Sequence, residues 1–196
     1  MKKIYFPSLN GIRFIAAFMV IVAHVSPYAT ERGFTASFFT IDYGALGVTV
    51  FFVLSGFLIT YLLFHEKQET QTIHVKQFII RRILRIWPAY FLAVGVGFFL
   101  FAPFHEGTRI FLEQHFWLKF SFFVLFLANG VRSVIFDAGV MSHLWSVCVE
   151  EQFYLAWPFL MKQFSHRFLT MAGSIIGGIL LLRIVFAYWN IYHLAE

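Results

Sequence analysis

The sequence predicts an all-α fold: a polytopic membrane helix bundle of about five spans plus one short re-entrant or interfacial segment. Of the 196 residues, 60% are hydrophobic and 13% are charged, and the mean hydropathy is +0.75. An ordinary soluble domain is about half apolar and about a quarter charged. The apolar residues also gather in runs near the ~20 residues that cross a bilayer, so lipid is expected to cover them.

Five segments have the length of a membrane span. We expect spans from about Leu9 to Tyr28, Gly44 to Phe64, Ile86 to Pro103, His143 to Lys162 and Phe168 to Trp189. Trp87-Pro88 is expected to open the third helix, because proline is tolerated in a first turn. Phe116–Ala128 is shorter and contains Lys119. That length fits a re-entrant or interfacial segment better than a crossing.

Basic residues set the expected orientation. The chain has 15 Lys and Arg against 10 Asp and Glu, and many of the basic residues flank apolar runs, which favours membrane topology over nucleic-acid binding. With Lys2 and Lys3 inside, the arginine cluster 81–85 also falls inside. Lys162 and Arg167 fall inside only if Phe116–Ala128 does not cross, which the positive-inside bias favours. We therefore expect a multi-pass protein of the cell membrane, surrounded by lipid, with a cytoplasmic N-terminus and no separate soluble domain within residues 1–196.

Two ionisable residues share one stripe of the first span. Arg13 and His24 are eleven residues apart, which is close to three helical turns, or ~16 Å along the axis. His24 could act as a general base, because an imidazole titrates near neutral pH. The alternative is an interfacial histidine wetted by lipid headgroups.

The fourth span carries two adjacent carboxylates. Glu150 and Glu151 point about 100° apart on a helix, and Glu150 shares its face with His143, Ser146 and Tyr154. Acids are costly inside a membrane, so they are expected to face a polar cavity or a partner.

These carboxylates have two possible roles. One could orient and charge-stabilise His24, while the other pairs with Arg13. Alternatively, both only neutralise buried arginines such as Arg13 and Arg183.

An arginine cluster precedes the third span. Arg81 and Arg85 are four residues apart on one helical face, with Arg82 beside them. A guanidinium fork suits phosphate, so the cluster could capture an anionic donor from the cytoplasm. The alternative is a cluster that only fixes topology.

Small residues are expected to serve close helix packing. Gly173 and Gly177 form a GxxxG pair, and Ser55-Gly56 lies in an uncharged span. Small side chains let helix backbones approach each other, so packing is the expected role of both pairs.

No metal site is expected. Cys148 is the single cysteine, so it can form neither an intramolecular disulfide nor a cysteine cluster. The remaining histidines lack the tight spacing of metal ligands; they are His65, His74 and His166 beside the spans, and His105 and His115 in the expected outer loop.

Four segments, taken in order, resemble a known family. They are LNGIRFIAAFMVIVAH, GVTVFFVLSGFLIT, RRILRIWPAY and HLWSVCVEEQFYLAWP. They are similar to the motifs of acyltransferase family three, the multispanning O-acyltransferases of bacterial cell surfaces. Asn10 stands where this family usually has Asp. The resemblance covers most of the chain but only the N-terminal half of the family domain.

The resemblance implies an activity and a site. Such enzymes transfer an acyl group, often acetyl, from cytoplasmic acyl-CoA to a hydroxyl of a cell-surface carbohydrate or similar acceptor. His24 would then be the catalytic base or acyl carrier and Arg13 its companion, with Glu150 and Glu151 supporting the site. Acyl-CoA (acetyl-CoA) would be a donor substrate, and no bound cofactor is implied.

The same resemblance implies which residues bind the substrates. Arg81, Arg82 and Arg85 are candidates for the CoA phosphates, and His143 and Tyr154 are further candidates for substrate contacts. The alternative is a truncated, non-catalytic membrane scaffold or partner subunit that needs a C-terminal half or a partner chain. A transporter, whose ionisable residues line a path, is a third possibility.

Overall fold

A computed structural model describes residues 6–31, 43–101, 104, 106, 109, 113, 116–130, 141 and 143–193, and no strand occurs in them. The helices are α1 (Pro7–Glu31), α2 (Tyr43–Thr70), α3 (Val75–Gly95), α5 (Phe116–Val124), α7 (Leu144–Phe164) and α8 (Phe168–His193). A π-helical turn, Val96–Phe101, continues α3, and a 3-10 turn, Ser165–Arg167, joins α7 to α8.

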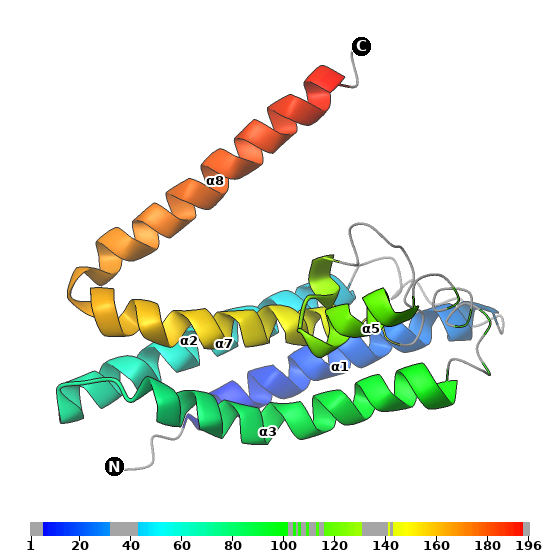
Figure 1. The fold of residues 1–196 in the computed structure, drawn as a ribbon, viewed down its shortest axis with the longest axis horizontal. Helices are drawn as coiled ribbons and strands as arrows, with labels where there is room; N and C mark the ends of the chain where they lie inside the picture. Colours follow the sequence, from blue (N-terminus) through cyan, green and yellow to red (C-terminus); the bar gives the residue numbers. More distant parts are fainter. Residues whose placement is uncertain are drawn as a thin grey trace.

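Among the described residues, four helical stretches are long and apolar enough to cross a membrane: Ser8–Ser26, Tyr43–Thr70, Val75–Phe101 and Leu144–Trp189. The last has 46 residues, about twice what one crossing needs. The turn at Ser165–Arg167 divides it into α7 and α8, which diverge in Figure 1. The predicted all-helical membrane bundle is therefore confirmed, and each expected span lies on a helix.

The third helix begins earlier than the sequence predicted. α3 starts at Val75 rather than near Ile86, so the arginines 81–85 lie inside it and Pro88 is an interior residue. The prediction that Pro88 opens the helix is wrong. The early half of α3 is amphipathic: it buries Val75 and Phe78 while remaining too charged to count as an apolar run. An interior proline is tolerated in such helices because their surroundings satisfy the freed backbone groups.

Helices α1, α2, α3 and α7 form the bundle (Figure 1). α1 packs along α2, and α7 packs against both α2 and α3. The last turns of α1 and the first turns of α2 and α7 gather at one end, together with α5 (Figure 1). We call this the histidine end, after His24 and His143. The opposite end holds the connections from α2 to α3 and from α7 to α8, and we call it the turn end.

A glycine allows the close approach of α1 and α2. A Cβ on Gly47 would lie 2.7 Å from the backbone oxygen of Ala16 and 2.8 Å from Cγ2 of Val20. Real Cβ atoms are not found at such distances, so only glycine fits here. This contact fixes the spacing of the two helices near the histidine end.

The short segment predicted at Phe116–Ala128 contains α5, which has nine residues. It packs between α3 and α7 in an apolar cluster that includes Tyr90, Phe98, Phe123, Phe126 and Cys148. The turn after α5 has a left-handed residue, Phe126, at φ 56°. Gln152 of α7 donates to the Phe126 carbonyl at 2.7 Å and so holds this turn.

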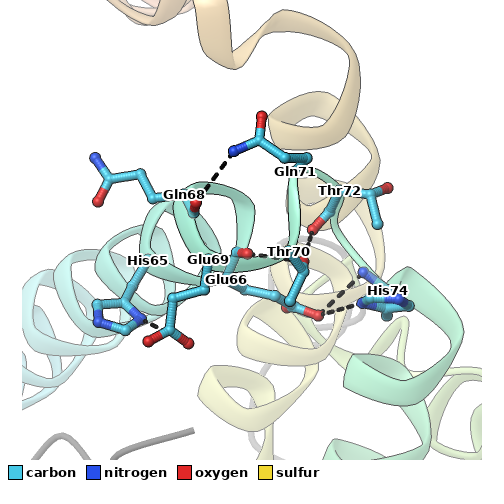
Figure 2. Close-up of polar contacts among 8 residues, drawn as sticks. All are labelled: His65, Glu66, Gln68, Glu69, Thr70, Gln71, Thr72 and His74. Carbon is cyan, nitrogen blue, oxygen red and sulfur yellow. Dashed lines mark hydrogen bonds and ion pairs between the residues drawn. The ribbon is translucent and has the colours of Figure 1, made fainter.

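Polar side chains close the turn end (Figure 2). Glu66 is buried, and one of its oxygens accepts a hydrogen bond from the His74 backbone N–H at 3.2 Å and lies 2.9 Å from His74 Nδ1. Lys67 donates to the hydroxyl of Ser165. The α2–α3 and α7–α8 connections are therefore linked to each other through the last turns of α2.

Helix α8 leaves the bundle. Beyond its first turns, the described side chains of α8 are exposed, including Arg183, and Figure 1 shows the helix pointing away from the others. A Cβ on Gly173 or Gly177 would meet nothing within 4 Å. The packing expected of this GxxxG pair therefore has no partner among the residues that the structure describes.

Candidate active site

The side chain of His24 is oriented by its own helix. Nδ1 of His24 lies 2.7 Å from the backbone oxygen of Val20, one turn earlier on α1. A carbonyl oxygen only accepts hydrogen bonds, so Nδ1 must carry the proton. Nε2 of the neutral ring then keeps its lone pair, as a general base or a nucleophile requires.

His24 lines a cavity at the histidine end. The cavity has a volume of about 550 Å³. Its walls come from α1, α2 and the start of α7: Val20, Ala23, His24, Gly44, Ala45, Val48, Thr49, Phe51, Phe52, His143, Trp145, Ser146 and Val147. The rings of Phe52 and Trp145 meet edge to face, with centroids 6.1 Å apart, and give the cavity an aromatic wall.

His143 faces His24 across this cavity. The two rings are perpendicular, with centroids 5.8 Å apart. His143 is exposed on one side, and the protein on its other side partly desolvates the ring and lowers the pKa of its imidazole; the nearby His24 lowers this pKa further. The structure therefore brings together two residues that are 119 positions apart in the sequence. The sequence predicted different roles for them, catalysis for His24 and substrate contact for His143.

A second polar cluster surrounds Glu150, about 10 Å further along α7. One oxygen of Glu150 accepts a hydrogen bond from the Ser55 hydroxyl at 3.1 Å. The other accepts one from the Tyr154 hydroxyl at 2.7 Å. The expected shared face of Glu150 and Tyr154 is confirmed. The expectation that Ser55-Gly56 serves packing is wrong, because Ser55 binds the carboxylate and a Cβ on Gly56 would meet nothing within 4 Å.

Glu151 points to a different neighbour, as the 100° offset predicted. Its Oε2 accepts a hydrogen bond from the indole N–H of Trp87 on α3 at 3.0 Å. The residue is 2% exposed, and its Oε1 is buried without a hydrogen-bond partner among the described residues. Glu151 therefore joins α7 to α3, whereas Glu150 joins α7 to α2.

The three arginines of α3 have different surroundings. Arg82 is half-buried, and its guanidinium lies 5.3 Å from the ring centre of Phe78 and 5.2 Å from that of Tyr154. Arg81 and Arg85 are exposed. Arg82 is thus the arginine that touches the Glu150 cluster.

Arg13 lies near this second cluster. Arg82 is within electrostatic range of Arg13, Arg85 and Glu150. Among the described residues, no hydrogen bond or ion pair joins Arg13 or either glutamate to His24, whose ring is held by Val20 instead. The candidate residues thus form two groups, a histidine pair at one end and a carboxylate–arginine cluster toward the middle of the bundle.

Sequence reasoning missed three contributors: the carbonyl of Val20, the hydroxyl of Ser55 and the indole of Trp87. Only Ser55 left a signal, as a lone hydroxyl in a span without charges.

In the described part of the chain, no group of three His, Cys, Asp or Glu residues could hold a metal ion. His105 and His115 lie outside the described residues.

A bundle of apolar helices that keeps two carboxylates and an arginine between its helices, and a pair of histidines in a cavity at one end, has the character of a polytopic membrane protein with a polar functional site. The family described as "Acyltransferase domain" matches residues 6–196. The chain belongs to this family, acyltransferase family three.

Two relatives illustrate the match. The peptidoglycan O-acetyltransferase OatA of Listeria monocytogenes is 33% identical over 170 residues, which cover 82% of this chain and 25% of that protein. The O-acetyltransferase OatA of Staphylococcus aureus is 32% identical over 169 residues, or 84% of this chain and 26% of that protein. The chain thus spans about a quarter of the length of these curated relatives. No solved structure matches the chain.

Proposed function

We propose that the protein is a membrane O-acyltransferase that moves an acetyl group from acetyl-CoA to a hydroxyl of a cell-wall carbohydrate. Membership of the family supports the reaction class. The names of the relatives, which include a peptidoglycan O-acetyltransferase, support the acyl group and the acceptor class.

One observation carries the proposal: His24 is fixed in the tautomer of a base inside a cavity that can admit a substrate. Val20 holds Nδ1, so the Nε2 lone pair is available for a proton. The cavity offers an aromatic wall and polar side chains, a combination typical of small-molecule sites.

The chemistry follows from this geometry. Nε2 of His24 removes the proton of the acceptor hydroxyl, and the oxygen attacks the thioester carbonyl. The carbon–sulfur bond then breaks, and the proton passes from His24 to the departing thiolate. In a two-step variant, Nε2 first takes the acyl group itself and then gives it to the acceptor.

We place the donor at the turn end of the bundle. Arg81 and Arg85 are exposed there, and Arg82 connects them to the Glu150 cluster. Guanidinium groups suit the phosphates of CoA. The thioester would then reach the histidine end past Glu150, Ser55 and Tyr154, which gives this cluster a role along the donor path.

The same arrangement supports a cytoplasmic N-terminus. The turn end carries a basic group that consists of Lys67, Lys76, Arg81, Arg85 and Lys162, and basic residues favour the cytoplasmic side. The histidine end would then face outward, toward the cell wall. Labelling of single cysteines placed at each end, in a Cys148→Ser background, would test this orientation in intact cells.

The decisive test replaces His24 with Ala in the full-length protein in its membrane. Transfer of labelled acetyl from acetyl-CoA should fall by about 10²-fold or more, while the amount of membrane-inserted protein stays the same. His166→Ala, at an exposed histidine of the turn end, is the matched control and should retain transfer. Full transfer by the His24→Ala protein would rule out this role. Mass spectrometry of the cell wall, with and without the intact gene, would identify the acceptor.

A further inference from the structure

An acyl transfer needs more than a base, because negative charge develops on the carbonyl oxygen in the transition state. An enzyme stabilises this oxyanion with a hydrogen-bond donor that is already in place. If the transfer takes place in this cavity, one group of its lining should therefore have a hydrogen that it can donate to this oxygen.

Most polar groups of the lining already use their hydrogens. His24 donates from Nδ1 to the Val20 carbonyl. The hydroxyl of Thr49 donates to the backbone oxygen of Ala45 at 2.8 Å, and that of Ser146 donates to the backbone oxygen of His143 at 3.0 Å. Trp145 also has an interaction of its own. The hydrogens of His24 Nδ1, the Thr49 hydroxyl and the Ser146 hydroxyl are therefore already donated within the protein.

His143 is different. Its ring contacts the ring of His24, and it makes no side-chain hydrogen bond with any other described residue. A neutral imidazole always carries one N–H. Among the polar side chains of the lining whose hydrogen bonds are described, His143 is therefore the one with an uncommitted hydrogen, and it faces the proposed base.

The surroundings of His143 favour the neutral ring. It directly precedes the first turn of α7, where the helix dipole disfavours a positive charge. His24 would repel a second proton whenever it holds one itself. From α2 the cavity lining brings no titratable side chain, and from α1 it brings only His24. No described lining residue is an acid that could stabilise an imidazolium at this position.

We propose that His143 is a second catalytic residue, which donates its imidazole N–H to the carbonyl oxygen of the acyl group as negative charge develops there. This proposal rests on the proposed function. The proton of the acceptor hydroxyl goes to His24, the new carbon–oxygen bond forms, and the carbonyl electron pair moves onto the oxygen that His143 contacts. When the carbon–sulfur bond breaks, this pair returns to the carbonyl, and His143 keeps its own proton throughout.

The test compares two replacements of His143 in the full-length protein. His143→Phe keeps an aromatic ring against His24 but removes the donor, so kcat should fall by about 10²-fold, with little change in the KM for acetyl-CoA. His143→Gln restores a neutral N–H donor and should recover at least a tenth of the wild-type kcat. His166→Ala, at an exposed histidine of the turn end outside the cavity, is the control and should keep the wild-type kcat.

Three outcomes would overturn the proposal. Equal loss of kcat in the Phe and Gln variants would mean that His143 transfers a proton. Full kcat in both would mean that it takes no part in the chemical step. A rise of KM alone would mean that it only binds substrate. If His143→Phe does not insert into the membrane, His143→Leu and His143→Asn provide the same comparison.

Failure of the inference can be told apart from failure of the proposed function. If the wild-type protein transfers acetyl and His24→Ala does not, the function stands whatever His143 does. If wild type and His24→Ala are equally inactive with acetyl-CoA and cell-wall acceptors, the function itself is wrong.

Discussion

The backbone oxygen of Ala16 lies 2.7 Å from the point at which a Cβ would stand on Gly47. This approach brings α1 against α2 one turn before Val20, whose carbonyl holds His24. Both helices supply walls of the cavity. The width of the cavity and the position of His24 therefore depend on Gly47, which lacks the methyl group that an alanine would carry.

Gly47→Ala should push α1 and α2 apart. Overpacking of this kind costs about 1–3 kcal/mol of unfolding free energy, and the displaced His24 should lower acetyl transfer by about tenfold or more. Gly56→Ala, on the same helix but with nothing within 4 Å of the added Cβ, is the control. It should be neutral or stabilising by about 0.5–1 kcal/mol. Thermal unfolding in detergent and a transfer assay would check both; equal behaviour of the two variants would refute the packing argument.

Glu151→Gln should be tolerated. The amide oxygen can still accept the hydrogen bond of Trp87, and the side chain keeps its size. Glu151→Leu leaves the partly buried indole N–H of Trp87 without its acceptor and should cost about 1–3 kcal/mol. The unfolding midpoints of the two variants would test this difference in stability. A Gln variant less stable than the Leu variant would contradict the assigned contact between Glu151 and Trp87.

Tyr154→Phe should destabilise the Glu150 cluster, in which Tyr154 and Glu150 of α7 meet Ser55 of α2. It removes the hydroxyl that donates to Glu150 at 2.7 Å but keeps the ring on which Arg82 lies. A hydrogen bond to a carboxylate is worth about 1.5–3 kcal/mol. Ser55→Ala removes the second donor. Because both hydroxyls serve the same carboxylate, the double variant should be non-additive in a mutant cycle of unfolding free energies. Simple additivity would show that the two bonds are independent.

Arg82→Lys should affect donor binding more than Arg85→Lys. Arg82 lies over the rings of Phe78 and Tyr154, a position that suits a planar guanidinium and not an ammonium. Arg85 is exposed and can be replaced with less loss. We expect the KM for acetyl-CoA to rise about tenfold in the first variant and less than threefold in the second. The reverse order would remove Arg82 from the donor path.

Acid should destabilise the protein through His143. The folded state lowers the pKa of this imidazole below its ordinary value of 6.5, because the protein partly desolvates the ring and His24 lies nearby. The unfolded chain therefore binds the proton more readily, and this contribution to stability is complete above about pH 6.5 and decreases as the pH falls below it. His143→Gln lacks this term, so its unfolding midpoint should drop less than that of wild type between about pH 7.5 and about pH 5.5. Equal drops would contradict the lowered pKa.

The sequence predicted the spans because hydropathy and length alone determine which segments lipid can cover. It misplaced the start of α3, because an amphipathic half-helix such as the one that begins at Val75 does not form an apolar run. A helix can therefore begin several residues before the apolar run that it contains, as α3 does. Helical geometry also predicted correctly that Glu150 and Glu151 face different partners.

The grouping of the site could not be predicted in the same way. Spacing on one helix placed Arg13 and His24 on a common stripe, but their neighbours come from α3 and α7, and only tertiary packing determines these. His24 contacts His143, whereas Arg13 lies in the electrostatic range of Arg82. The hydrogen bond from His24 Nδ1 to the Val20 carbonyl depends on the rotamer of His24. No pattern of residues in the sequence specifies this rotamer.

The described contacts of the candidate site involve α1, α2, α3 and α7, and α8 contributes none of them. Since the described contacts of α8 with the bundle lie near the Ser165–Arg167 turn, a probe attached further along this helix should leave His24 undisturbed. The helix could therefore carry a spin label or an affinity handle for purification, while the residues of the candidate site stay unmodified.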